Sequence, residues 1–455
     1  MLNETISAIS TAYGKGGVAV IRISGDNALE VAKKVFKAKA KEIEPRRAYY
    51  GEILRDSTII DDGILTYYKA PNSFTGEDVC EICCHGGIYS TQAVLESILS
   101  SGARLAQAGE FTKRAYINGK LTLSRAEAIS NVIDAKTDSQ LRLSSSIARG
   151  TLSAKIDEIR ETIISLISRA YAVIDYPDED IEDNTYEDMK KSIDTVISLL
   201  DCLKRSYKAG KAVSEGVKAA IVGKPNAGKS SLYNILLGKD LAIVTDIAGT
   251  TRDVIESTAS IGGVTLCLAD TAGIRETNDT VEKIGVSRAI EKIEESELIL
   301  CVFDYSRKEE DEDIQILNEI SGKNKIGIIN KTDTSKGISC EFEEKIKSSF
   351  DKVVYISTRD GSGLDELSKA ISDLYELGNF DLSNDAIIAN ARQSASVSLA
   401  LNEAIYAKEA LSNQMTPDVV CFTLEKALSE LNMIDLRDAG EEIVNAIFSR
   451  FCVGK

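Results

Sequence analysis

The sequence predicts a multidomain protein that combines α/β domains with a helical bundle. Three observations carry this prediction. A glycine-containing phosphate-loop pattern follows an apolar strand near the middle of the chain, and short strands alternate with helices over the first 118 residues. Apolar residues follow a helical period from about residue 124 to residue 212 and again after residue 379. Alternating strands and helices indicate α/β domains, whereas long helical periods without strands indicate a bundle.

Length and composition limit the class of protein. The chain has 455 residues, enough for about two to four domains. Its hydrophobic content of 43% suffices for packed cores. A net charge of −17 argues against a surface that coats nucleic acid throughout, although a local basic patch remains possible. No signal peptide opens the sequence and no apolar run approaches ~20 residues, so we expect a cytoplasmic protein that does not associate with a membrane.

Residues 1–118 are predicted to form an α/β domain that lacks a phosphate loop. We expect strands at 5–10, 17–24, 48–54, 63–68 and 79–84, and helices at 26–38 and 89–100. The glycine-rich segment 14–17 does not have the spacing of a phosphate loop. It is interpreted as the loop of a hairpin between the first two strands.

The nine cysteines lack the spacing of a disulfide framework, which fits a reducing compartment. Cys80, Cys83 and Cys84, followed by the single histidine His85, are compatible with a zinc site. The same stretch also has the pattern of a strand, and no second C-x-x-C pair completes a set of four ligands. We therefore favour small buried hydrophobic side chains over a metal site here.

Two helical segments are predicted, at 119–215 and 378–455, on either side of an α/β domain at 216–377. We expect helices at 386–412 and 424–451 in the second segment. Neither segment alone has many helices with which to bury its apolar faces, so the simplest account is one bundle interrupted by an inserted domain. Two separate helical modules are the alternative.

The inserted domain begins with a strand that runs into a phosphate loop. Residues 223–230 read G-x-x-x-x-G-K-S. Glycines allow the backbone to turn its N–H groups toward a polyphosphate at the start of the next helix. Lys229 is expected to reach the terminal phosphates, and Ser230 is expected to ligate Mg²⁺. The phosphate-binding residues predicted from this loop are Asn226, Ala227, Gly228, Lys229, Ser230 and Ser231.

Two further motifs, each at the end of a predicted strand, indicate recognition of guanine. Asp333 follows the strand 325–329, and its carboxylate can accept from both the ring N–H and the exocyclic amine of guanine, a pair of donors that adenine does not offer. The segment after the strand 353–356 can supply an N–H group to the guanine oxygen. The predicted base-binding residues are Asn330, Lys331, Asp333, Ser357, Thr358 and Arg359.

Two segments of the inserted domain are expected to sense the γ-phosphate. Residues 245–253 occupy the place of a switch loop, in which Thr251 can give its hydroxyl to Mg²⁺. After the strand 264–269, Asp270 can hold Mg²⁺ through water and Gly273 can meet the γ-phosphate. Ile274 stands where many signalling GTPases have glutamine, so another group must orient the water. The predicted nucleotide contacts here are Thr245, Asp246, Ile247, Ala248, Gly249, Thr250, Thr251, Asp270, Thr271, Ala272 and Gly273.

These motifs, together with two segments outside the inserted domain, carry a resemblance to a known family. The segments are Gly109–Leu121, which reads GEFTKRAYINGKL, and Phe451–Lys455, which reads FCVGK. Over its whole length, including residues 71–78, the chain resembles the tRNA-modification GTPases called MnmE or TrmE. The resemblance implies an N-terminal α/β folate-binding domain, a central helical bundle and an inserted Ras-like P-loop GTPase domain.

The resemblance also implies an activity and partners. Members of the family are homodimers held by their N-terminal domains, and they work with an FAD-dependent partner, MnmG, in a heterotetramer. Together they install an aminomethyl or carboxymethylaminomethyl group on carbon five of the wobble uridine of certain tRNAs. The one-carbon unit comes from a tetrahydrofolate derivative, in the 5-formyl or methylene form. The expected cofactors are therefore GTP, Mg²⁺, K⁺ and this folate, with FAD on the partner.

Site residues follow from the resemblance position by position. The implied K⁺ site consists of Asn226 with Thr245, Ile247 and Thr250, and the ion does the work of an arginine finger. The implied catalytic residues are Lys229, the water-orienting Glu282 and Cys452, for which a packed or exposed thiol without a covalent role is the alternative. The implied folate contacts are Arg22, Glu81, Lys120 and Lys455.

A second class of function remains open at this point. A ribosome-assembly GTPase, acting as an RNA-binding switch without modification chemistry, would share the nucleotide motifs. It would not need the folate contacts or the C-terminal thiol. Binding of a reduced folate distinguishes the two classes.

Overall fold

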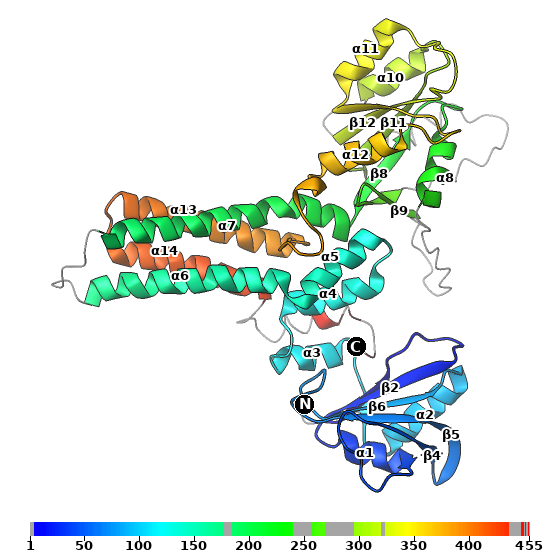
Figure 1. Cartoon of the computed structure of the whole chain (residues 1–455), viewed down its shortest axis with the longest axis vertical. Coiled ribbons are helices and arrows are strands. Elements are labelled where there is room, and N and C mark those ends of the chain that lie inside the picture. Colours follow the sequence, from blue (N-terminus) through cyan, green and yellow to red (C-terminus); the bar gives the residue numbers. More distant parts are fainter. Residues whose placement is uncertain are drawn as a thin grey trace. The chain divides into compact units, whose positions relative to one another are not determined.

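The computed structural model describes residues 4–175, 184–239, 257–268, 295–319, 324–435, 447–449, 451 and 454. The chain divides into two compact units, the first formed by Met1–Ser130 and Asp435–Lys455 and the second by Asn131–Ile434. Figure 1 shows the elements of both, and each unit is described by itself. Among the described residues, no helix is long and apolar enough to cross a membrane.

The first unit is built on a seven-stranded mixed sheet with the order β3-β4-β5-β6-β2-β1-β7. Neighbouring strands pair antiparallel, except that β1 and β7 run parallel. The bounds are β1 (Ile6–Ile9), β2 (Val18–Ser24), β3 (Phe36–Ala38), β4 (Ala48–Arg55), β5 (Thr58–Tyr68), β6 (Val79–His85) and β7 (Arg104–Leu105). The antiparallel pairing of β1 with β2 confirms the predicted hairpin.

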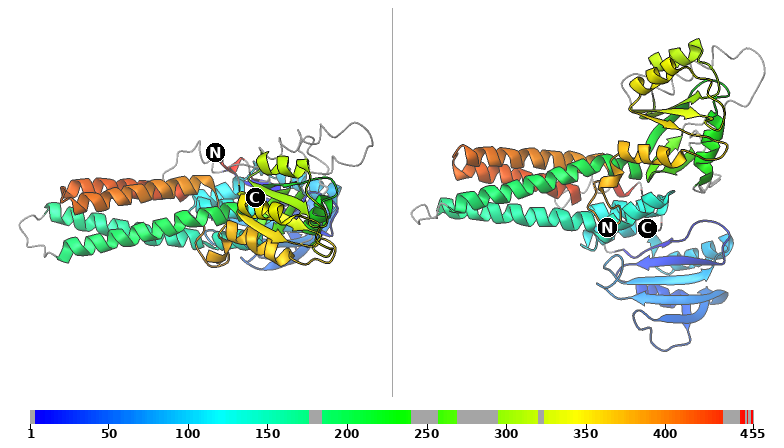
Figure 2. Two further views of the ribbon diagram at one scale, coloured as in Figure 1. Left: turned by 90° about the horizontal axis from the view of Figure 1, so that it is seen from above. Right: turned by 45° about the horizontal axis from the view of Figure 1, so that its top comes forward.

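Helices α1 (Ala28–Val35) and α2 (Ile88–Ser100) cover one face of this sheet, as Figures 1 and 2 show. Apolar residues of α1 recur every three or four positions, which gives the helix a single buried side. Alternate residues of β2, including Ile21 and Ile23, point into the same core. Arg22 and its register partner Glu81 therefore lie on the opposite face.

The rest of the first unit consists of short helices and the end of the chain. Helix α3 spans Glu110–Ile117, and α4 spans Leu123–Asp134. A small apolar cluster joins Leu123 and Ala126 of α4 to Phe448. Residues close to the C-terminus therefore pack against segments that follow the N-terminal sheet.

The second unit contains the helical bundle: α5 (Asp138–Arg149), α6 (Thr151–Asp175), α7 (Asn184–Ser214), α13 (Ala391–Ser412) and α14 (Pro417–Asp435). Figures 1 and 2 show α6, α7, α13 and α14 side by side. Arg160 Nε of α6 donates to Asn432 Oδ1 of α14 at 2.8 Å, and Lys408 of α13 pairs with Asp194 of α7 at 2.6 Å. The two helical segments thus form one bundle, which confirms the interrupted arrangement and excludes two separate modules.

The inserted domain is a six-stranded sheet with the order β13-β12-β11-β8-β10-β9, in which only β9 is antiparallel to its neighbour. The strands are β8 (Val217–Val222), β9 (Ser257–Ile261), β10 (Val264–Leu268), β11 (Leu298–Asp304), β12 (Asn324–Asn330) and β13 (Lys352–Tyr355). The helices are α8 (Lys229–Lys239), α10 (Asp311–Glu319), α11 (Cys340–Ser349) and α12 (Leu364–Leu374), followed by the 3₁₀ turn η1 (Leu377–Asn379).

Four predicted elements differ from the structure by more than one residue. The strand predicted at 63–68 begins earlier, at Thr58, as β5. The helix predicted at 26–38 ends at Val35, because the chain becomes extended at Phe36 and pairs as β3 with β4. The helix predicted from residue 386 begins at Ala391, since the side chain of Asn390 accepts from the backbone N–H of Gln393 at 2.9 Å and caps it there. The helix predicted at 424–451 starts earlier, at Pro417 of α14, and the described residues of its predicted range are 424–435, 447–449 and 451.

Candidate functional site

The phosphate loop lies between β8 and α8 and is shaped by its two glycines. Gly223 has a φ of 146°, and a Cβ atom there would lie 2.3 Å from the carbonyl oxygen of Val302. Gly228 has a φ of 101°, and a Cβ atom there would lie 2.0 Å from the side-chain nitrogen of Asn330. A larger residue at either position would displace the loop from the strands beside it.

Lys229 stands at the first position of α8 and is held by the loop itself. Its ammonium donates to the carbonyl oxygens of Gly223 and Lys224, both at 2.7 Å. Burial lowers the pKa of Lys229 from its ordinary value. Ser230 and Ser231 lie at the start of the helix, where Ser231 is exposed, and Asn226 is exposed with a φ of 61°. The loop therefore has an ammonium and a helix N-terminus side by side, which is the arrangement that binds polyphosphates.

Asn330 joins the three predicted nucleotide-binding segments that the structure describes. Its side chain is fully buried, and its Nδ2 donates to the carbonyl oxygen of Ala227 at 2.8 Å. Its Oδ1 accepts from the backbone N–H of Thr358 at 3.1 Å. One amide thus ties the phosphate loop to the loops after β12 and β13.

The loops after β12 and β13 also hold the predicted base-recognition residues together. Asp333 Oδ1 accepts from the hydroxyl of Ser357 at 2.9 Å, and Asp333 Oδ2 lies 3.7 Å from the guanidinium of Arg359. Ser357 is fully buried and its hydroxyl oxygen accepts from the backbone N–H of Arg359 at 3.2 Å. The Asp333 carboxylate is therefore oriented by its neighbours in the loop that follows β13.

Asp304, at the end of β11, is a site residue that the sequence motifs did not indicate. It accepts from the ammonium of Lys331 at 2.6 Å and from the Nε of Arg307 at 3.0 Å. Burial opposes ionisation, but the hydrogen bonds from Lys331, Ser306 and Arg307 lower the pKa of Asp304 to about 2. The sequence feature that could have indicated Asp304 is a carboxylate at the end of an apolar run. In the sheet, this run is β11, which pairs with β8, the strand before the phosphate loop.

Several predicted site residues lie outside the described part of the chain. They are the nucleotide contacts Thr245, Asp246, Ile247, Ala248, Gly249, Thr250, Thr251, Asp270, Thr271, Ala272 and Gly273, the catalytic candidates Glu282 and Cys452, and Lys455. Of the predicted Mg²⁺ and K⁺ ligands, Ser230 and Asn226 are described, and both belong to the phosphate-loop motif.

The predicted folate contacts of the first unit lie around the loop 71–78. Arg22 donates to Glu81 Oε1 from Nε at 2.9 Å and from Nη2 at 2.8 Å. The same guanidinium stacks on the ring of Phe74 at 5.1 Å. Lys120 donates from its ammonium to the carbonyl oxygen of Pro71 at 3.0 Å. Arg22 and Lys120 thus contact the same loop.

The C-terminal segment reaches the N-terminal sheet at Gly454. Ser10 donates from its hydroxyl to the carbonyl oxygen of Gly454 at 3.0 Å. Gly454 has a φ of 96°, and a Cβ atom there would lie 2.1 Å from the carbonyl oxygen of Ile9. Only glycine fits this contact without a shift of the backbone.

The cysteines of β6 behave as core residues. Cys80 and Cys84 are buried, and burial raises the pKa of Cys80 to about 12 and that of Cys84 to about 11. Within the described ranges, the one group of three metal-ligating side chains close enough to share an ion is Asp61, Asp62 and His85, and it includes no cysteine. This favours the interpretation of the cysteines as small hydrophobic residues.

Comparison with known proteins identifies the family. The model for the MnmE helical domain matches residues 123–452, and the model for the GTP-binding protein TrmE N-terminus matches residues 5–120. The chain belongs to the MnmE family. Relatives named tRNA modification GTPase MnmE cover the whole chain over their own whole length, with 42% identity in Clostridioides difficile (strain 630) and 41% in Thermoanaerobacter pseudethanolicus.

A solved structure resembles part of the chain. A single-residue variant of Aquifex aeolicus Era bound to GDP·AlF4⁻ is 29% identical and covers 41% of this chain and 66% of its own, with a TM-score of 0.27. The full-length MnmE relatives and the two family models, rather than this partial likeness, define the family.

Proposed function

We propose that the protein is a GTP-hydrolysing enzyme of tRNA modification. With an FAD-dependent MnmG partner, in a heterotetramer, it adds an aminomethyl or carboxymethylaminomethyl group to carbon five of the wobble uridine of certain tRNAs. A tetrahydrofolate derivative supplies the one-carbon unit. The names of the full-length relatives support the coarse function. The observation that carries the GTP-binding part is the convergence of three motif-bearing loops on Asn330.

Asp333 selects guanine in this proposal, because its carboxylate accepts from two donors that only guanine presents together. In Asp333→Asn, an amide N–H donor replaces one of the carboxylate oxygens that accept hydrogen bonds from guanine. The variant is therefore expected to prefer xanthosine triphosphate over GTP. Competition between the two nucleotides for the full-length protein measures the shift, with Asp360→Asn, which removes a neighbouring carboxylate that binds the backbone of Ser362, as the matched control. Unchanged preference in Asp333→Asn would remove Asp333 from the base pocket.

We further propose that hydrolysis depends on K⁺ and on Glu282. Mg²⁺ and K⁺, when bound by Ser230, Thr251 and Asn226 with the backbone of residues 245–250, supply positive charge to the phosphates. Replacing K⁺ by Na⁺ is expected to abolish most turnover, and Glu282→Ala is expected to bind GTP normally while kcat falls on the order of 10²-fold. GTP turnover in the two salts, for both proteins, tests this. Equal rates of GTP turnover in K⁺ and Na⁺ would contradict the proposed K⁺ site. A wild-type rate in Glu282→Ala would contradict the proposed catalytic role of Glu282.

The folate site is proposed for Arg22, Glu81, Lys120 and Lys455. Two described cations and a carboxylate around one loop support it, because cations suit the glutamate tail of a folate and a carboxylate suits its pterin N–H groups. Binding of a reduced folate by the purified protein separates this proposal from the ribosome-assembly alternative.

A homodimer in the cytoplasm completes the proposal, with domains at 1–118, 119–215, 216–377 and 378–455. A row of paired residues crosses four strands on the sheet face opposite α1 and α2, namely Tyr50, Ile64, Cys83 and Val20. Tyr50 and Ile64 are exposed there, which supports association through this domain. The mass of the protein in solution tests it, and a monomer at micromolar concentration contradicts it.

A further inference from the structure

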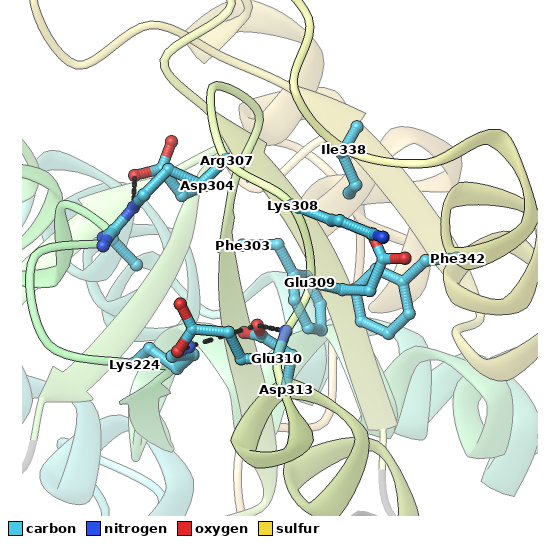
Figure 3. Close-up of a pocket in the computed structure, with 11 residues that line it drawn as sticks. Lys224, Phe303, Asp304, Arg307, Lys308, Glu309, Glu310, Asp313, Ile338 and Phe342 are labelled. Atoms are coloured by element: carbon cyan, nitrogen blue, oxygen red, sulfur yellow. Dashed lines mark hydrogen bonds and ion pairs between the residues drawn. The ribbon is translucent and has the colours of Figure 1, made fainter.

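Lys224, the second residue of the phosphate-loop motif, turns its side chain away from the loop. Its ammonium pairs with the carboxylate of Glu310 and lies 3.5 Å from Asp313 Oδ2, at the start of α10 (Figure 3). The Lys224 side chain is 12% exposed and that of Asp313 is 13% exposed, so this end of the contact is shielded from water. The ammonium of Lys224 in the phosphate loop is thus paired with two carboxylates, those of Glu310 and Asp313, named here the acidic pair.

Asp313, the shielded carboxylate of the acidic pair, has a contact besides the one with Lys224. Asp313 Oδ2 accepts from the backbone N–H of Glu310 at 3.0 Å. Both residues stand at the N-terminus of α10, where negative side chains complement the helix dipole. The ammonium of Lys224 lowers the pKa of Glu310, which keeps this carboxylate charged. Asp313 is therefore held by a contact of its own, whereas the Glu310 side chain, which is 63% exposed, is held through its pair with Lys224.

The segment that carries Glu310 also supports the phosphate loop at the next residue. Arg307 Nη2 donates to the carbonyl oxygen of Pro225 at 3.4 Å, and its Nε donates to Asp304. A surface pocket here is lined by Lys224, Arg307 and Glu310 together with the apolar side chains of Phe303, Ile338 and Phe342 (Figure 3). Residues 304–313 thus form a strut, named here the acidic strut, that braces the outer side of the phosphate loop.

The acidic strut is linked to Lys229 through one backbone group. The carbonyl oxygen of Lys224 is one of the two on which the Lys229 ammonium rests. We propose that Lys224 is a positioning residue of the GTPase: paired with Glu310 and Asp313, it fixes the first turn of the phosphate loop and so the place of the Lys229 ammonium. This inference rests on the proposed GTP site and goes beyond it, because none of the predicted nucleotide contacts is in the strut.

A simpler interpretation makes an opposite prediction. If Lys224 acted only as a positive charge near the phosphates, then neutralising Glu310 and Asp313 would strengthen nucleotide binding, because two nearby negative charges would be removed. If Lys224 acts by position, the same change weakens binding, because the ammonium loses its anchor. The sign of the change in affinity distinguishes the two.

The experiment measures the affinity of the full-length protein for GTP and GDP in Mg²⁺ and K⁺, with thermal unfolding as a check of folding. The decisive variant combines Glu310→Gln with Asp313→Asn, since both amides keep the size of the side chains and the amide oxygen at position 313 can still accept from the N–H of residue 310. Lys224→Ala and Lys224→Arg are the companion variants. Lys336→Ala is the matched control, because it removes an ion pair of the same domain, to Glu343 at 2.6 Å, away from the phosphate loop.

The double variant and Lys224→Ala are expected to bind both nucleotides about five- to tenfold more weakly, the scale of a shielded ion pair. Lys224→Arg is expected to bind close to wild type, and Lys336→Ala to be unchanged. Equal or tighter binding by the double variant, with wild-type binding intact, overturns the role of Lys224 and leaves the GTP site standing. Failure of the wild-type protein to bind GTP would overturn the proposed function itself.

Discussion

At the scale of single residues, a buried ion network holds the first unit together. Arg114 is 1% exposed and pairs with Glu77 Oε2 at 3.0 Å and Glu110 Oε1 at 3.0 Å. Arg104 binds the two carboxylate oxygens of Glu110 with Nη1 at 2.8 Å and Nη2 at 2.7 Å. Glu110 and Arg114 belong to the GEFTKRAY segment that marks the family. In the structure, Glu110 and Arg114 of this segment form ion pairs with each other and with Arg104 and Glu77, so that the buried charges of the segment have partners.

Glu110 makes stability depend on pH in a defined window. Burial opposes its ionisation, but the hydrogen bonds from Arg104, Gln107 and Arg114 lower its pKa from 4.5 to about 2. Because the folded-state pKa is depressed, the stabilisation is complete above pH 4.5 and is lost as the pH falls toward 2. Glu110→Gln is expected to lower the free energy of unfolding at pH 7 by roughly 3 kcal/mol, because it leaves Arg114 short of a buried partner.

Denaturant unfolding of both proteins between pH 7 and pH 2 measures this effect. The difference between wild type and Glu110→Gln is expected to shrink below pH 4.5. Glu30→Gln, which breaks an exposed pair with Lys33, is the control and is expected to change stability little. A pH-independent difference for Glu110→Gln would show that its charge is not the cause.

At the scale of elements, the sequence predicted the strands that carry motifs. The strands predicted at 264–269, 325–329 and 353–356 are found as β10, β12 and β13 with shifts of one residue at their ends. Short apolar runs bounded by polar motifs suffice for this. β10 and β12 are largely buried, whereas β13 is an edge strand in which Val354 is the buried residue. The local pattern did not reveal β3 or the late start of α13, where a pairing and a cap decided the bounds.

The order of strands and the contacts between loops could not be predicted from local patterns. Asn330 was expected at the base, yet its amide also binds Ala227, 103 residues away in the sequence. Asp304 is the last residue of β11, a strand without a known motif, and the rest of the acidic strut follows it. The one local signal was a carboxylate at the end of an apolar run. Such contacts depend on which strand ends lie side by side in the sheet, and this is set by tertiary packing.

At the scale of the whole molecule, the two ends of the chain belong to one compact unit. Phe448 packs against α4, and the carbonyl oxygen of Gly454 accepts from the hydroxyl of Ser10. The C-terminal segment thus contacts the rest of the first unit at these two positions. The sequence predicted a functional C-terminal tail from its thiol and its cation. It could not show that Gly454 is the residue that fixes the tail, because the contact with Ile9 exists only in the folded chain.

Deletion of Cys452–Lys455 is expected to abolish tRNA modification, to weaken binding of a reduced folate and to leave GTP turnover at the wild-type rate. The physical reason is that the tail would bring a thiol and a cation to the proposed folate site. Complementation of cells that lack the protein, followed by nucleoside analysis of their tRNA, measures modification.

Gly454→Val is the matched variant, since it keeps Cys452 and Lys455 but places a side chain against the Ile9 carbonyl oxygen. It is expected to reproduce the loss of modification. Full modification by the deletion variant would show that the tail has no part in the chemistry.

The interrupted bundle has a consequence for how the protein folds. The backbone N–H of Ile388 donates to the hydroxyl of Ser206 at 3.1 Å, a contact that closes a loop of 182 residues around the inserted domain. Compared with a turn of about ten residues, closing such a loop from an unfolded chain costs roughly 2.5 kcal/mol more in entropy. An inserted domain that is already folded holds its two ends at a fixed separation and removes most of that cost. Closure of the helical bundle is therefore favoured after the inserted domain has folded. We expect the inserted domain to fold before the two helical segments pack against each other.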